Sequence, residues 1–90
     1  MTVHELKTDP DAFKNVLCGR KNFEIRRNDR YFKVGDLLLL HETVSSGEEM
    51  KNGKPLKYTG RTIPRIINYI LPGGQYGIDP EFVVMDVVKI

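Results

Sequence analysis

The sequence predicts an α+β protein, mainly β, in which one or two short helices cover a small, mostly antiparallel barrel or strongly curved sheet of about five to six strands. Three observations predict this fold: a short helical segment that ends at a glycine, several apolar runs of strand length separated by turn residues, and a length of only 90 residues. A chain this short buries about 60 to 65% of its unfolded surface, which is too little for two cores. We therefore expect one domain over residues 1–90.

The first expected elements are a short strand and a helix. Residues 3–7, VHELK, alternate weakly between apolar and polar side chains. Thr8 or Asp9 can then cap a helix that has Pro10 in its first turn, where the missing N–H costs nothing. Apolar residues recur at helical spacing until Gly19, which supplies the left-handed conformation that ends a helix.

A charged strand follows this helix and holds the densest chemistry of the chain. If Phe23 and Ile25 point inward, the two-residue period of a strand places Glu24 and Arg26 together on the opposite face. The preceding turn would deliver Lys21 to the same place. Such a cluster is suited to holding a polar ligand.

The rest of the chain reads as strands and turns. The leucines at 37–40 form a short run bounded by turns, which predicts a strand buried on both faces. Residues 43–57 have almost nothing to bury, so we expect a mobile loop without fixed structure. Residues 58–71 have a β-branched composition that favours a strand, with Pro64 at an edge or bulge. Residues 82–90 close the chain as a last strand.

Composition limits the classes of protein and of site. The chain is 40% hydrophobic and 29% charged, as in soluble globular proteins, and no apolar run approaches the roughly 20 residues that span a bilayer. Its opening segment lacks a signal peptide's apolar stretch, and Cys18 is the one cysteine, so we expect a cytoplasmic location. Cys18 is expected to be a buried small hydrophobe rather than a nucleophile. His4 is expected to be a hydrogen-bonded core or rim residue. With His41 the one other histidine, we predict no metal site and no cofactor.

The formal net charge of +2 is too small to indicate nucleic-acid binding, but the charges are unevenly distributed. Residues 20–33 contain six Lys or Arg and two acids, whereas residues 42–49 contain three glutamates and no Lys or Arg. The first segment is suited to phosphate, and the second would repel it.

Several short motifs, in this order, resemble the DUF3850 family: HELK, GRKNFEIR, NDR, VGD, TGR and the closing FVVMDVV. That family belongs to the ASCH domains of the PUA-like superfamily. The broader ASCH signature GxKxxExR is matched by Gly19, Lys21, Glu24 and Arg26, and the narrower FEIRxNDR by residues 23–30. The resemblance implies a PUA-like pseudobarrel and a role in RNA binding. Some small ASCH members are regarded as amidohydrolases that act on acylated cytidine.

The resemblance and the charge cluster together predict a cleft, lined by Lys21, Glu24 and Arg26, that binds a nucleotide or single-stranded RNA. Unpaired bases need a flat ring and an edge partner, while phosphate needs cations. The additional candidates are Lys7, Arg27 and Arg30, which would add charge at the rim, and Tyr76, which would stack on a base.

Each candidate also has a plain structural reading. Lys21 and Glu24 could form a surface ion pair worth at most about 1 kcal/mol. Residues 28–30 could form a simple turn with a local ion pair. Tyr76 could bury its ring and leave its hydroxyl in water.

Two other functions stay open. In an amidohydrolase, Lys21 would activate water or attack an acyl group while Glu24 shuttles the proton, with Thr8, a backbone N–H or residues 72–77 stabilising the oxyanion. In a protein-interaction module, the acidic residues 42–49 or an edge strand near Pro64 would be the contact. The sequence leaves the oligomeric state open.

Overall fold

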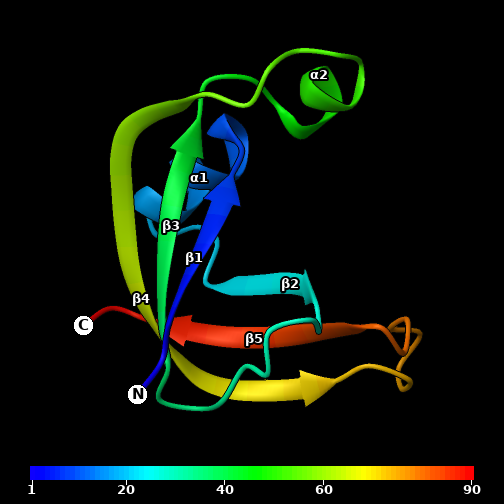
Figure 1. Ribbon diagram of the computed structural model, residues 1–90. Coiled ribbons are helices and arrows are strands. Elements are labelled where there is room, and N and C mark those ends of the chain that lie inside the picture. The colour runs from blue at the N-terminus through cyan, green and yellow to red at the C-terminus, as the bar shows by residue number, and fades with distance from the viewer.

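Five strands and two short helices make up the structure, a computed structural model that describes residues 1–90. In chain order the elements are β1 (Val3–Thr8), α1 (Pro10–Leu17), β2 (Phe23–Arg27), β3 (Leu37–Thr43), α2 (Gly47–Lys51), β4 (Tyr58–Pro72) and β5 (Phe82–Val88). The strands form one curved sheet, a half-barrel, in the order β1-β3-β4-β5-β2 (Figure 1). The predicted fold class is confirmed. Neither helix has the length and apolar character needed to cross a membrane.

The long strand β4 joins the two parts of the sheet. Its first half pairs with β3 as far as Ile66, and its second half, from Ile66 to Pro72, pairs with β5. The register shifts between Ile67 and Tyr69, and the strand bends so that β2 and β5 run across the direction of β1 and β3 (Figure 1). Pro64 pairs with Leu39 on β3 and lies outside the half that pairs with β5. The expected edge position of Pro64 is confirmed.

The sheet stays open because its two end strands, β1 and β2, do not pair with each other. β1 runs parallel to β3, while the other three pairings are antiparallel. The half-barrel therefore has a gap between the free edge of β1 and the free edge of β2. This gap positions the candidate site described below.

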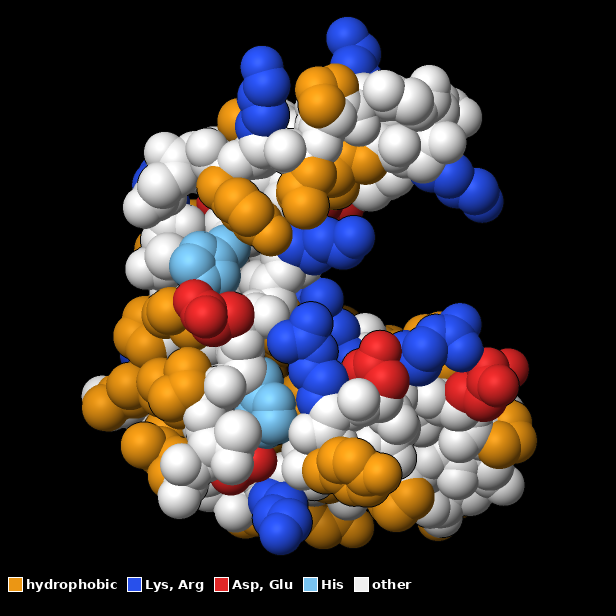
Figure 2. All heavy atoms as spheres, in the orientation of Figure 1, with side chains coloured by type: hydrophobic (Ala, Val, Ile, Leu, Met, Phe, Trp, Pro, Cys, Tyr) orange, Lys and Arg blue, Asp and Glu red, His pale blue; other side chains and the backbone are white.

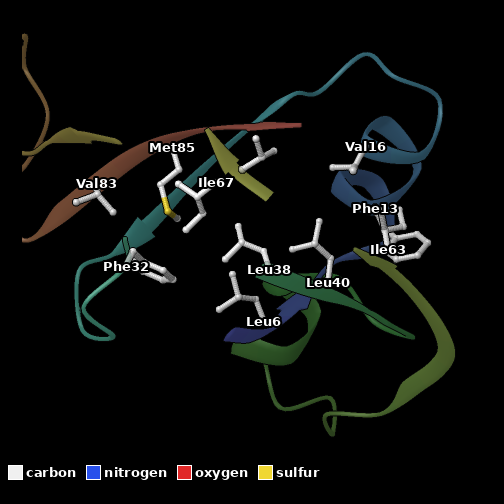
Figure 3. Close-up of a cluster of buried hydrophobic side chains, with 11 residues drawn as sticks. Leu6, Phe13, Val16, Phe32, Leu38, Leu40, Ile63, Ile67, Val83 and Met85 are labelled. Atoms are coloured by element: carbon white, nitrogen blue, oxygen red, sulfur yellow. The ribbon is translucent and has the colours of Figure 1, made fainter. Parts of the chain in front are cut away.

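The hydrophobic core lies on the inner side of the curved sheet, where α1 packs against it. Side chains from α1 and four strands, together with Phe32, point into one continuous space (Figure 3). Leu38 and Leu40 on β3 are fully buried, but Leu37 and Leu39, which alternate with them, are partly exposed. The prediction that this strand is buried on both faces is wrong, because the core covers one face of β3.

Two other expectations are wrong. Residues 43–57 are not structureless, since they contain the helix α2, which Ser46 and Glu49 start with a capping box. Cys18 is exposed rather than buried. It is the C-cap of α1, two positions after Val16, the last buried residue of that helix.

A buried polar pair ties the first strand to the turn before β3. His4 is buried, and its Nε2 lies 2.9 Å from Oδ2 of Asp36, so the expectation of a hydrogen-bonded core histidine is confirmed. The carboxylate of Asp36 also accepts hydrogen bonds from the backbone N–H groups of Thr2 and Lys33. The hydrogen bond with His4 is the main reason that the pKa of Asp36 lies below its ordinary value of 3.8.

We predict that Asp36→Asn lowers the free energy of unfolding by about 1–3 kcal/mol near neutral pH, because the charged acceptor of three hydrogen bonds is lost. The pKa of Asp36 is lower in the folded state than in the unfolded state, so the ionised carboxylate stabilises the fold above pH 3.8. This stabilisation is lost as the pH falls through the lowered pKa. Urea unfolding between pH 7 and pH 2.5 should therefore show the two proteins converging at the acid end. A stability difference that stays constant over this range would contradict the role given to Asp36.

Candidate functional site

The turn between α1 and β2 places Lys21 two residues before the start of β2. Gly19 adopts a positive φ of 83° after the C-cap, as expected. The backbone N–H groups of Arg20 and Lys21 both donate to the carbonyl of Asn15, at 2.9 Å each. The side-chain amide of Asn22 donates to the carbonyl of Gly19 at 3.0 Å. The position of Lys21 is thus set by hydrogen bonds within the turn.

Lys21, Glu24 and Arg26 form one connected ionic triad. The Nζ of Lys21 lies 2.7 Å from Oε2 of Glu24 and also donates to the carbonyl of Phe23 at 2.7 Å. Arg26 donates from Nε and from one terminal nitrogen to the other oxygen, Oε1 of Glu24, at 3.0 and 2.9 Å. The carboxylate of Glu24 is 2% exposed, while the two cations are 22% and 23% exposed. One buried carboxylate therefore holds two partly exposed cations in place.

The inward face of β2 is the charged face, not the apolar one. Phe23 and Ile25 are 46% and 51% exposed, whereas Glu24 is buried, so the expectation that the two apolar residues point inward is wrong. Glu24 and Arg26 do share the opposite face, as expected. The buried charge is tolerated because Lys21 and Arg26 compensate it and its oxygens are hydrogen-bonded.

Two arginines bridge the gap between the free strand edges. Arg26 donates to the carbonyl of Lys7 at 3.0 Å and to the hydroxyl of Thr8 at 3.3 Å. Arg30, which follows β2, donates to the carbonyl of Glu5 at 2.8 Å. The carbonyl of Thr2 accepts a hydrogen bond from the N–H of Leu37, so every second residue of β1 from there directs its backbone groups toward β3. The carbonyls of Glu5 and Lys7, at the intervening positions, point toward the free edge. Guanidinium groups thus satisfy acceptors that a sixth strand would otherwise pair.

A cavity of about 360 Å³ opens beside the triad, within the size range of small-molecule sites. In Figure 2 the hollow lies between the part that carries α2 and the part that carries β2 and β5, and Lys and Arg side chains gather in it. Its walls come from the end of β1, both helices, the end of β3 and β2. The lining residues are Lys7, Thr8, Asp9, Ala12, Lys21, Phe23, Glu24, Ile25, Arg26, Thr43, Gly47 and Met50.

The free edge of β2 contributes backbone groups to this cavity. The carbonyl of Asn22 and the N–H of Asn28 form hydrogen bonds on the β5 side of the strand. Between these two residues, the backbone N–H and C=O groups point alternately toward β5 and away from it. The N–H and C=O of Ile25 consequently point away from β5, on the side where Ile25 lines the cavity. A donor and an acceptor from one residue are available there.

Polar side chains at the cavity keep some hydrogen-bonding capacity. The ammonium of Lys21 has three N–H groups and two protein acceptors, which leaves one donor. The hydroxyl of Thr8 accepts from Arg26 and can donate its own proton. Asp9 caps α1 through Oδ1, which accepts from the N–H of Ala12 and leaves Oδ2 as an acceptor. The cavity therefore offers donors, an acceptor and apolar wall from Ala12 and Met50.

The other predicted site residues are distributed unequally. Lys7 lines this cavity and a neighbouring one, while Arg27 and Arg30 line the neighbour but not this cavity. Arg27 is paired with Glu81 at 2.6 Å on the surface. Tyr76 is 84% exposed in the connection between β4 and β5 and lines neither cavity. The structure brings the basic residues together and leaves Tyr76 apart.

Seven of the lining residues were not expected from the sequence: Asp9, Ala12, Phe23, Ile25, Thr43, Gly47 and Met50. The pattern Ser46-x-x-Glu49 is a capping-box signal and would have predicted the helix that carries Met50. No group of three or more His, Cys, Asp or Glu side chains is arranged to hold a metal ion.

Comparison with known proteins matches residues 3–87 to a family model described as "Domain of unknown function (DUF3850)". A curated relative from Escherichia phage P2, described as an uncharacterized 12.9 kDa protein in the GpA 3′ region, is 45% identical over 42 residues. That stretch is 47% of this chain and 38% of the relative, so the match spans less than half of the relative's length.

The burial of Glu24 generates a stability prediction. Arg26→Ala should lower the free energy of unfolding by about 3 kcal/mol, because it leaves a buried carboxylate with one cation and frees two acceptors on β1. The matched control is Arg27→Ala, one residue along the same strand, where an exposed ion pair is lost and the cost should stay below about 1 kcal/mol. Chemical denaturation measures both. Equal small losses would mean that the triad contributes little to the fold.

Proposed function

Because this chain belongs to the DUF3850 family, a domain of unknown function, we propose its function from the geometry: the cavity between β1 and β2 binds the base of a nucleotide or of single-stranded RNA. One observation carries the proposal. A lysine ammonium fixed by Glu24 faces a cavity of about 360 Å³ that also has an apolar wall.

The chemistry of the lining supports a heterocyclic base as the occupant. The edge of a nucleobase carries donors and acceptors side by side, and its faces are apolar. The remaining donors of Lys21 and Thr8, the acceptor on Asp9 and the backbone pair of Ile25 match such an edge. Ala12 and Met50 supply surface for a ring face.

The proposal includes the wider relationship and setting. The curved half-barrel with a basic hollow agrees with kinship to the ASCH domains of the PUA-like superfamily. We place the ligand-binding unit within residues 1–90, around the one hydrophobic cluster, and in the cytoplasm.

A second candidate, an amidohydrolase, is favoured by one observation: Lys21 and Glu24 touch at 2.7 Å beside the cavity, with Thr8 nearby. The state of Glu24 argues against it. Both of its oxygens already accept hydrogen bonds from a cation, so neither faces a substrate or water as a free proton acceptor. The ammonium of Lys21 is likewise held by two acceptors rather than left free as a nucleophile. Binding therefore ranks above catalysis.

Binding of nucleosides, nucleotides and short single-stranded RNA should be saturable at low salt in fluorescence or calorimetric titration. Lys21→Met should weaken the affinity about tenfold or more, because a charge-assisted hydrogen bond is lost. Lys14→Met is the control, since it removes the same charge from an exposed position on α1 away from the cavity. No saturable binding by any of these ligands would end the proposal.

Catalysis is tested by incubating the protein with acylated nucleosides and following the products by chromatography. We expect tight binding of some ligands without turnover. Turnover in the wild type that disappears in Lys21→Met but persists in Lys14→Met would instead establish the enzyme.

A further inference from the structure

A second cavity, of about 380 Å³, adjoins the first along the gap in the sheet. Four cations line it, Lys7, Arg26, Arg27 and Arg30, together with one carboxylate, Asp29. The first cavity has three cations and two carboxylates in its lining. The second cavity is therefore the more strongly basic of the two.

The cations of this second cavity differ in how far they are already neutralised. Arg26 pairs with Glu24 and Arg27 pairs with Glu81, so a protein carboxylate compensates each. Lys7 forms no ion pair, but its ammonium lacks the planar fork of donors that an arginine presents. Arg30 instead donates to a backbone carbonyl, that of Glu5, at 2.8 Å, and its nearest carboxylate oxygen, on Asp29, is 3.9 Å away. A carbonyl fixes the guanidinium without cancelling its charge, and most of the five N–H donors of Arg30 stay available.

The two cavities are continuous in their lining. Lys7 and Arg26 contribute to both, so one ligand can occupy the first cavity and extend into the second along the gap. The fork of donors on an arginine matches the oxygens of a phosphate.

We propose that the second cavity is a phosphate-binding subsite in which Arg30 is the main contact, so that the ligand is a nucleotide or a nucleic-acid strand rather than a free nucleoside. This inference rests on the proposed function, since it takes the first cavity as the site of the base. The phosphate belongs either to a free mononucleotide or to the backbone of an RNA strand, and both present the same anionic oxygens.

The experiment titrates the full chain with a nucleoside, its 5′- and 3′-monophosphates and a short single-stranded RNA, each at low and at moderate salt. A phosphate should raise the affinity about tenfold or more over the nucleoside, and this gain should fall as salt rises. Arg30→Gln should remove most of the gain from phosphate and lower nucleoside affinity far less. Arg20→Gln is the matched control, since it deletes the same charge from an exposed turn residue that lines neither cavity.

The possible outcomes separate the two proposals. Nucleoside binding with no gain from phosphate, or a gain that Arg30→Gln does not reduce, overturns the phosphate subsite and leaves the base site standing. Phosphate binding that depends on Arg30 but not on Lys21 supports the subsite and overturns the base site. A gain for both monophosphates identifies a mononucleotide ligand, whereas a gain confined to the RNA identifies the strand. If Arg30→Gln lowers stability, the salt dependence of wild-type binding still tests the phosphate subsite. An affinity gain from phosphate that does not change with salt concentration contradicts the subsite.

Discussion

Hydrogen bonds from two guanidinium groups to the free edge of β1 hold the open side of this half-barrel. Arg26 and Arg30 reach the carbonyls of Lys7 and Glu5, which no strand pairs. Unpaired backbone edges are costly when buried and prone to pair with other chains when exposed. Side chains therefore satisfy the edge while leaving a space that a strand would have filled. Both cavities lie along this gap, so the same contacts that complete the fold also define the candidate site.

Glu24 links this closure to the chemistry of the site. Its carboxylate orients Arg26 toward β1 through one oxygen and holds Lys21 through the other. Long, flexible cationic side chains lose considerable rotamer entropy when they bind a ligand. Here the side chains of Lys21 and Arg26 are already held by Glu24 in the folded protein, so much of this rotamer entropy is lost on folding rather than on binding. The site is consequently preformed, which favours selective recognition over adaptable surface binding.

Features that depend on residues close in the sequence were predictable, including the helix that ends at Gly19 and the grouping of Lys21, Glu24 and Arg26. Which face of β2 is buried was not predictable, because alternating apolar residues normally mark the buried face of a strand. Here the partners that make a charged inner face stable include β1, and the contact from Arg26 to β1 spans 19 residues. The short helix α2 has no buried residue, so hydrophobic periodicity could not reveal it. Local pattern thus identified the ionic triad, and long-range contacts decided its surroundings.

The bend in β4 gives this arrangement a mechanical property. Adjacent strands joined by a backbone ladder lie about 4.8 Å apart, whatever their side chains. Where β1 faces β2, the separation is instead set by the reach of an arginine stem, and away from the gap the two halves of the sheet are joined through β4. The aperture is therefore adjustable in evolution by single substitutions that leave every strand intact. A change in the length of one side chain would thus alter the width of the gap without any redesign of the sheet.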